Sequence, residues 1–449
     1  MSILLGMAAV VVLVVAVPYA VRLLLRSVDD PVGTALPVYV LLLPFGSGIH
    51  IPLPLPSAFA SLSSLAGAWA IVAMALHISA TRRALSTNIV ACALFVTLLG
   101  VLAFTYLWSI NPATTSENLY VMVSVVALFV LGALIEVDAR SLRRVEAYAI
   151  VGGVLACAYG VWLLRTGRLV SHDQGPARFA TAGGSGDQAD PNITAATLLL
   201  PFLFALLWTL RERTKLVRAG ALLATVLIGF GILLTGSRGG ALAAIVGALI
   251  LVSHTGGRNF VRGALGLAIS AAVILTLLPS SISSRFSEAT STGRTEVWSA
   301  GLHACSTYCW RGSGWGTFPD VYMKTVLTTP TLPGYNGILD FKAHNMWLEL
   351  LVEGGIVALA LAALGIASLL RTVWHIPHAQ RAAPLAGLAA LLVSNMFLSN
   401  FGFKYFWFTM LYAALAANVR SDVSPPDGRR FGEVDTSDSF ASRDTGDSS

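Results

Sequence analysis

The chain has 449 residues, of which 55% are hydrophobic and 12% are charged, and its mean hydropathy is +0.74. Apolar runs long enough to cross a bilayer recur along almost the whole chain, which is typical of a polytopic α-helical membrane protein. The short alternating segments of a β-barrel are absent from the sequence. The net charge of +6 does not indicate nucleic acid binding, because most basic residues lie in short loops.

We therefore expect an all-α bundle of about 12 or 13 transmembrane helices. The first apolar run has no positively charged residues before it and is followed by Arg22 and Arg26, so we expect a retained span and not a cleaved signal. The second, ninth and twelfth runs are short enough to be re-entrant or tilted. The predicted spans cover residues 3–24, 34–46, 58–79, 88–107, 118–135, 146–164, 192–210, 216–234, 239–253, 261–278, 345–370, 384–398 and 404–418.

Basic residues gather in every second loop of this arrangement. Such loops face the cytoplasm under the positive-inside rule, so the alternate loops face outward. The tail after Arg420 belongs to the cytoplasmic side, and its polar composition without apolar periodicity predicts disorder. We expect a transmembrane domain over 1–418 and a disordered tail over 419–449. The outward segments are the loops 47–57, 108–117, 165–191 and 279–343, the last of them large and helical, and the turn 235–240.

Two of the four cysteines lie in the large outward loop. An oxidising compartment allows a disulfide between Cys305 and Cys309, but a four-residue separation on a helix is barely bridgeable, so the bond stays open. His303 and these cysteines lack a fourth ligand for a structural zinc site. Cys92 and Cys157 lie in apolar spans and are expected to be small core residues.

His344 stands where the polar loop 279–343 gives way to a long apolar helix. On that helix Asn345, Glu349 and Glu353 fall on one face, because they are spaced by four residues. Carboxyl groups inside an apolar span are costly in lipid, so both glutamates should face protein or a wet cavity. Each glutamate either ties the helix to its neighbours or takes part in a site.

Arginine side chains provide the second candidate chemistry. Arg238 lies in the glycine-flanked turn 235–240, where its guanidinium suits a phosphate or carboxylate and the glycines allow close approach of a ligand. The alternative is an arginine that snorkels to lipid headgroups. Arg294 opens a short loop helix, and taken alone it would be a solvated residue paired with Glu296. The same applies to Arg178.

Several groups of residues follow one another in an order that resembles a known pattern. They are Trp108-Ser109-Ile110-Asn111-Pro112 with Ser116, Gly186-Asp187-Gln188-Ala189-Asp190-Pro191-Asn192, Thr235-Gly236-Ser237-Arg238-Gly239, Gly293-Arg294 with Trp298 and then Gly312-Ser313-Gly314-Trp315-Gly316-Thr317-Phe318, and His344-Asn345 with Leu348 and Glu353-Gly354-Gly355. Each group is weak alone, but together they resemble the O-antigen ligase / Wzy O-antigen polymerase superfamily of bacterial membrane glycosyltransferases. The resemblance covers about Trp108 to Gly355.

The resemblance implies a GT-C-like enzyme in the cytoplasmic (inner) membrane of a bacterium, with its active site on the extracytoplasmic side. It would take a glycan from undecaprenyl diphosphate and transfer it to an acceptor hydroxyl, with inversion and without a metal or other cofactor. The two arginines and one histidine that dominate the family's site carry over to Arg238, Arg294 and His344 as catalytic residues. We also expect substrate contacts from Arg178, Asn192, Trp298, Asn345 and Glu353.

The chemistry of these residue types agrees with that implication. Two guanidiniums neutralise a departing lipid diphosphate through charge-assisted hydrogen bonds. An imidazole, with an ordinary pKa of about 6.5, suits removal of the proton from the attacking hydroxyl.

Alternatives remain open from the sequence. A polymerase that extends a glycan, or an enzyme that glycosylates protein hydroxyls, would use the same donor and differ in the acceptor, which is a lipid, a glycan or a protein. A transporter or flippase of lipid-linked sugars would carry charges at mid-membrane and an inverted repeat, and neither is evident. A scaffold without activity would not need Arg238, Arg294 and His344.

Overall fold

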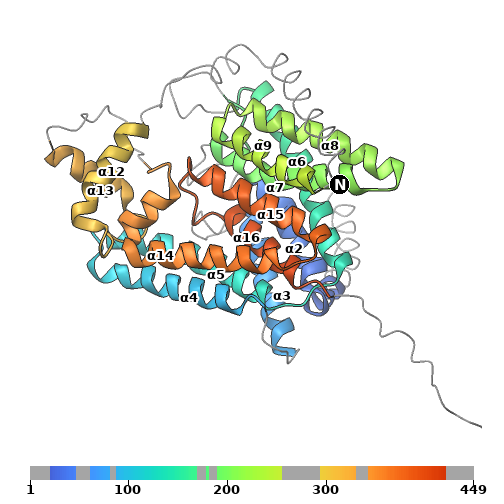
Figure 1. Ribbon diagram of the computed structural model, residues 1–449, viewed down its shortest axis with the longest axis horizontal. Helices are drawn as coiled ribbons and strands as arrows, with labels where there is room; N and C mark the ends of the chain where they lie inside the picture. Colours follow the sequence, from blue (N-terminus) through green and yellow to red (C-terminus); the bar gives the residue numbers. More distant parts are fainter. Residues whose placement is uncertain are drawn as a thin grey trace, which may run out of the picture. The chain divides into compact units, whose positions relative to one another are not determined.

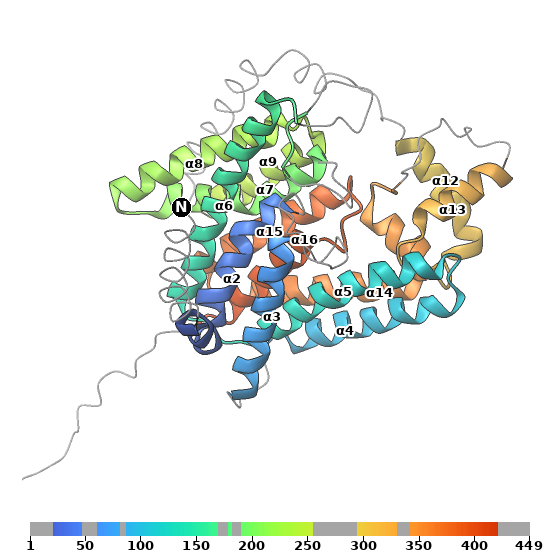
Figure 2. The same cartoon turned by 180° about the vertical axis from the view of Figure 1, so that it is seen from behind.

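The computed structural model describes residues 21–46, 61–80, 87–168, 178–181, 190–254, 294–329 and 342–420 (Figures 1 and 2). The expected all-α class is confirmed: the described residues form helices joined by turns, and an isolated bridge pairs Val137 with Val419. Most of the predicted tail 419–449, most of the span 3–24 and the span 261–278 lie outside the described residues.

The chain is helical over 21–29, and this segment meets the next helix at 115°. The remaining helices are α2 (Pro31–Leu42), η1 (Leu43–Phe45), α3 (Leu62–Ala80), α4 (Ile89–Phe104), η2 (Thr105–Trp108), α5 (Pro112–Ala133), α6 (Ala139–Arg165), α7 (Pro191–Arg211), α8 (Lys215–Leu234), α9 (Arg238–Ser253), α12 (Arg294–Tyr308), α13 (Phe318–Thr328), α14 (Met346–Trp374), α15 (His378–Asn395) and α16 (Lys404–Ala417).

Asx-Pro pairs start three of these helices. Asp30, Asn111 and Asp190 are the N-caps of α2, α5 and α7, and each side chain accepts a hydrogen bond from a backbone amide of the first turn. Proline follows in each case, and its fixed φ and missing N–H suit the first helical position. The starts of these helices are therefore encoded locally in the sequence.

Seven helices among the described residues are long and apolar enough to cross a membrane, or eight if the bent pair over 21–45 counts as one span. They agree with the predicted spans, but α5 and α6 begin earlier than the predicted 118 and 146. The reason is that their first turns are polar, as in Pro112–Asn118, so hydropathy misses helix that extends beyond the apolar region. α9 has only 16 residues, which fits its prediction as a short segment.

α7 and α16 form the centre of the bundle. Nearly every side chain of α16 is buried, and 83% of the apolar window of α7 is buried, against about a third in α3, α4 and α8. The aromatic rings of Phe95, Phe129 and Trp407 pack edge to face, with centroids 5.1–5.8 Å apart. Both helices are apolar on all sides, as is typical of helices that are surrounded by protein. The less buried helices α3, α4 and α8 have more side chains free to contact lipid.

The two ends of the bundle differ in chemistry. At one end the basic loops meet acidic partners: Arg143 pairs with Glu212, and Arg144 lies 3.7 Å from Asp30. These residues flank the start of α6, the end of α7 and the start of α2, so these loops share one end, as the alternation of basic loops predicts.

The helices α12 and α13 lie at the other end of α4, α5 and α14 (Figures 1 and 2). They pack around a hydrophobic core of their own, which is distinct from the core of the bundle and centres on Phe318. Ala343 and Val352, from the start of α14, complete this second core. The predicted large outward loop is therefore helical where the structure describes it, and it is packed onto the beginning of α14.

Candidate functional site

Arg238 is the first residue of α9 and follows a tightly bonded turn. The Ser237 hydroxyl accepts a hydrogen bond from the Gly240 amide, and the Thr235 hydroxyl accepts one from the Ser237 amide. The Arg238 side chain is exposed at the helix N-terminus, where the helix dipole also favours an anion. The turn therefore presents a guanidinium and a helix N-terminus at the same point.

Arg178, from a different segment of the chain, is hydrogen-bonded to this turn. Its Nε donates a hydrogen bond of 2.8 Å to the Thr235 carbonyl, and its side chain is half-buried. The structure therefore places Arg178 beside the turn of Arg238, although it is far from the turn in sequence. This bond supports a role in holding the turn; a substrate contact by Arg178 stays a prediction.

Arg294 starts α12 and is half-buried. Burial lowers the pKa of its guanidinium, the nearby positive charge of Arg238 lowers the pKa further, and Asp190 opposes both. Two guanidiniums whose positive charges interact repel each other, and a bound anion would relieve that repulsion. This electrostatic interaction connects the two arginines that the sequence named, which are 56 residues apart in the chain.

Asp190 joins this group and was not among the predicted site residues. Its carboxylate accepts a hydrogen bond of 2.7 Å from the Asn192 amide, so it caps α7 while it also interacts with Arg294. Asn192 lies two residues after Asp190, at the half-buried start of α7. In the sequence Asp190 stands in an Asp-Pro-Asn group. This pattern predicts a helix cap, but it does not predict the electrostatic interaction with Arg294.

His344 lies at the start of α14 with an unusual backbone. Its φ is 46°, in the left-handed region, where L-residues other than Gly, Asn and Asp are seldom found. Asn345 follows as the N-cap, and its Oδ1 accepts bonds from the amides of Trp347 and Leu348 at 3.0 and 3.1 Å. The side-chain oxygen of Asn345 thus accepts hydrogen bonds within the helix, and only its side-chain nitrogen Nδ2 is left for the predicted substrate contact.

Trp298 lies one turn after Arg294 on α12 and connects this helix to His344. Its indole N–H donates a hydrogen bond of 2.8 Å to the Ala343 carbonyl, directly before His344. The charge of Arg294 on α12 thus interacts with that of Arg238, and Trp298 on the same helix bonds the residue that precedes His344; that the three residues form one catalytic site stays a prediction.

Glu353 is only 1% exposed and is fully bonded. Its two carboxylate oxygens accept hydrogen bonds of 2.8 Å from the backbone amides of Gly316 and Phe318. In return, the Gly314 amide donates to the Glu353 carbonyl, and the Ser313 amide to the Val352 carbonyl. We call this set of bonds between α14 and residues 313–318 the Glu353 clamp. The clamp favours the structural role of Glu353 over the predicted substrate contact, because both buried carboxylate oxygens accept hydrogen bonds from backbone amides.

The clamped loop depends on glycine at three positions. Gly312, Gly314 and Gly316 have φ values of 84°, 116° and 86°, which side chains with a Cβ rarely adopt. A fourth, Gly355, has φ 77° and interrupts α14, where a Cβ would lie 2.8 Å from the Trp310 carbonyl. The glycines in the matched sequence groups therefore serve close backbone packing at the top of α14.

The early outward loop completes this packing. The Trp108 indole donates to the Gly312 carbonyl at 3.2 Å, and the Ile110 amide donates to the Ser313 carbonyl at 2.9 Å. Asn111 caps α5 and also contacts Asp320 of α13. The Trp-Ser-Ile-Asn-Pro group thus holds the loop between α12 and α13 instead of facing the arginines.

We predict that Glu353→Ala destabilises the protein by about 2–5 kcal/mol, since two buried amides lose their acceptor. The stability of Glu353→Gln should lie between those of wild type and Glu353→Ala, because a side-chain amide offers one acceptor oxygen to two donors. The check is thermal unfolding of the purified protein in detergent. Glu117→Ala, at an exposed position on α5, is the control. Equal melting temperatures for Glu353→Ala and wild type would contradict the structural role.

Two lysines near the site were also missed. The Lys342 ammonium lies 5.6 Å from the centre of the Phe403 ring and interacts electrostatically with the half-buried Glu349. The Lys404 ammonium donates to the hydroxyl groups of three serines at the start of α3, namely Ser61, Ser63 and Ser64. No regular spacing links these lysines to His344 in sequence, so only tertiary packing reveals them.

Cys305 and Cys309 form a disulfide at the end of α12, with a Cα–Cα distance of 4.4 Å, and Cys92 and Cys157 are buried free thiols. The bond that the spacing left open is therefore present in the structure. It closes one turn of the helix that carries Arg294. Within the described segments no group of three His, Cys, Asp or Glu residues could hold a metal ion.

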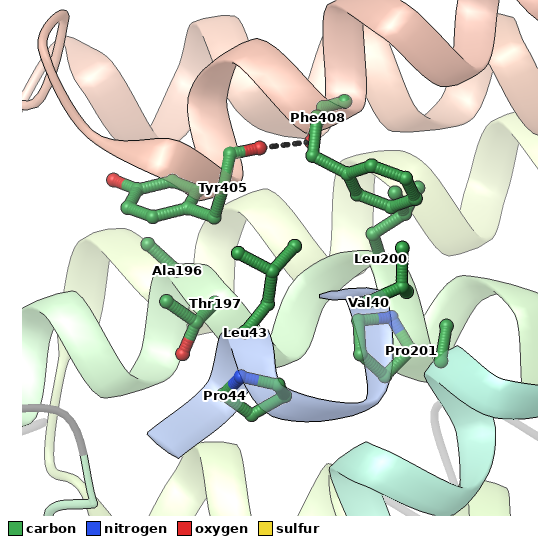
Figure 3. A pocket seen from close by; sticks show the side chains of 11 residues that line it. Val40, Leu43, Pro44, Ala196, Thr197, Leu200, Pro201, Tyr405 and Phe408 are labelled. Atoms are coloured by element: carbon green, nitrogen blue, oxygen red, sulfur yellow. Dashed lines mark hydrogen bonds between the residues drawn. The ribbon is translucent and has the colours of Figure 1, made fainter. Parts of the chain in front are cut away.

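A cavity inside the bundle is not the substrate site. It lies between α2, α6, α7 and α16, and Figure 3 shows Leu43, Thr197 and Tyr405 among its lining side chains. Its volume of about 20 Å³ has room for one water molecule, far less than a sugar requires. The Thr409 hydroxyl beside it donates to the Tyr405 carbonyl, so its polar groups serve packing.

Residues 223–363 match the family model described as O-Antigen ligase. This segment is similar to an O-antigen ligase domain. This match confirms the predicted recognition over the segment that runs from α8 into α14 and contains Arg238, Arg294 and His344. Arg178 and Asn192 lie outside it. None of the curated proteins matches the chain.

The matched family is of the membrane glycosyltransferase or ligase type, and its partners are in general lipid-linked glycans and their acceptors. The several apolar helices of the chain agree with a multi-pass membrane protein.

Proposed function

We propose that this protein is an O-antigen ligase-like glycosyltransferase. It moves a glycan from undecaprenyl diphosphate to an acceptor hydroxyl, with inversion and without a metal ion. The observation that carries the proposal is the electrostatic interaction of Arg238 with Arg294 inside the matched segment, together with the hydrogen bond from Trp298 of α12 to the Ala343 carbonyl, next to His344. Two like charges held close, at a helix N-terminus, form a site for a polyanion.

In the proposed reaction the acceptor oxygen attacks the anomeric carbon of the glycan on the face opposite the diphosphate. A bond from that oxygen to the carbon forms while the bond from the carbon to the diphosphate oxygen breaks, and the configuration inverts. Undecaprenyl diphosphate leaves with the bonding electron pair. Arg238 and Arg294 stabilise the negative charge that grows on it, which is the part a metal ion plays in many phosphate enzymes.

His344 is the proposed general base. As the acceptor attacks, its hydroxyl proton passes to the imidazole, and the proton is later released to solvent. An imidazole, whose ordinary pKa is about 6.5, is mostly neutral at physiological pH and can therefore accept a proton. General-base assistance is typically worth about 10²–10⁴ in rate.

The proposed setting is the cytoplasmic (inner) membrane of a bacterium. The end of the bundle that carries Arg143, Arg144 and their partners faces the cytoplasm, so the arginine pair and His344 face outward. The polyprenyl tail would stay in the bilayer, and the acceptor would come from the aqueous side. A polymerase or a protein O-glycosylating enzyme would use the same site and donor, and the acceptor decides between them.

The direct test is transfer by purified protein in nanodiscs, with undecaprenyl-diphosphate glycan as donor and a lipid-core, glycan or peptide acceptor offered separately. We expect product in the presence of EDTA, because side chains supply the positive charge. The preferred acceptor identifies the enzyme as ligase, polymerase or protein-modifying enzyme.

The transporter alternative makes a different prediction for the same preparation. Movement of the donor across the bilayer without any glycan product would show that the protein is a flippase and not a transferase. Product that disappears with EDTA and returns with Mg²⁺ would contradict the metal-independent mechanism while keeping the transfer.

A further inference from the structure

The strained backbone at His344 needs a cause in the surrounding structure. A positive φ is uncommon for residues other than glycine, and it persists where neighbouring contacts determine it. Downstream, the Asn345 cap fixes the first turn of α14. Upstream, Ala343 is fully buried in the core of α12 and α13, and its carbonyl has a defined donor.

That donor is Trp298. We infer that Trp298 is a positioning residue, whose indole N–H holds the Ala343 carbonyl and thereby fixes the His344 backbone relative to the helix that carries Arg294. The bond is 2.8 Å long. Arg294 and Trp298 are four residues apart on α12 and so share a face of the helix. The helix α12 therefore positions both Arg294, the proposed anion-binding residue, and the backbone beside His344, the proposed base.

This role differs from the substrate contact that the sequence analysis predicted for Trp298. An indole has a single donor and no acceptor, and here the donor is used inside the protein. The half-buried ring stays available for packing but not for hydrogen bonding to a substrate. Removing the N–H should therefore leave donor affinity intact and slow the chemical step.

The inference rests on the proposed transfer reaction, and the test separates the two. The full chain in nanodiscs carries, at position 298, the tryptophan isostere in which sulfur replaces the N–H, so shape and packing are kept. Trp298→Phe is the second variant. Trp310→Phe is the matched control, because Trp310 lies just past the same helix and is 82% exposed. We expect kcat to fall about 10- to 100-fold in the first two with an unchanged KM for the donor.

Two further measurements exclude a general structural effect. In a His344→Asn background, the isostere should cause no additional loss, because there is no base left to position. The ring resonance of His344, labelled with ¹⁵N and assigned by His344→Asn, should shift in the isostere and stay in place in Trp310→Phe.

A full kcat in both Trp298 variants, an equal loss in the His344→Asn background, or an unmoved His344 resonance would overturn the inference. If wild type transfers no glycan, the proposed function fails, but the histidine resonance still decides whether Trp298 fixes His344.

Discussion

Replacing His344 with asparagine should lower glycan transfer by about 10²–10⁴-fold, because the acceptor hydroxyl loses its general base. Asparagine is the informative choice because it tolerates the left-handed backbone that His344 adopts, with φ 46°. Alanine at this position would add backbone strain of roughly 1–2 kcal/mol and mix a folding defect with a catalytic one. The measurement is the initial rate of product formation in nanodiscs, at saturating donor.

His303→Asn is the matched control for this variant, since His303 lies exposed on α12. It should keep the wild-type rate. Thermal unfolding of His344→Asn should match that of wild type, because Trp298 bonds the backbone and not the imidazole. A His344→Asn protein that transfers glycan at the normal rate would remove His344 from the mechanism and leave the arginines to act without a base.

Replacing either arginine with glutamine should lower the rate by about 10²–10³-fold, as loss of one donor to a developing oxyanion does. The double variant should lose less than the product of the two single losses, because both guanidiniums act on the same diphosphate. Arg238→Lys should recover little, since an ammonium keeps the charge but not the planar fork that binds two oxygens. Rates and donor affinity are measured on the same preparations.

Arg311→Gln provides the matched control, because Arg311 is an exposed arginine in the same outward segment. It should bind and transfer normally. The isolated Arg294→Gln change should also relieve repulsion with Arg238, so the variant should unfold at a temperature no lower than wild type. Strictly additive losses in the double variant would show that the arginines act at separate places, against the proposed shared anion.

Local sequence could predict the membrane class and most helix positions. The N-caps Asp30, Asn111 and Asp190, each followed by proline, start their helices through bonds within one turn. Where the prediction placed α5 too late, the cause was a polar first turn that hydropathy does not register. Helix starts are local events, so a short stretch of residues suffices to encode them.

The roles of individual site residues were harder to predict from sequence. Glu353 and Asn345 fall on the same helical face as Glu349, yet Glu353 closes a clamp on distant amides and Asn345 caps its own helix. Periodicity gives the face of a helix, but it does not give the partner that the face meets. Asp190 and Lys342 escaped for the same reason, because their partners come from other helices.

The sequence by itself predicted an all-helical membrane protein, resembled the O-antigen ligase family whose model matches residues 223–363, and named Arg238, Arg294 and His344 as candidate site residues. Composition and residue order suffice for these predictions, because long apolar runs and the order of short motifs can be read directly from the chain. Only the tertiary structure showed that the charges of the two arginines interact and that Trp298 of α12 donates a hydrogen bond to the Ala343 carbonyl, next to His344. Charge repulsion and hydrogen bonding act over a few ångströms, and packing alone brings residues so far apart in sequence within that range.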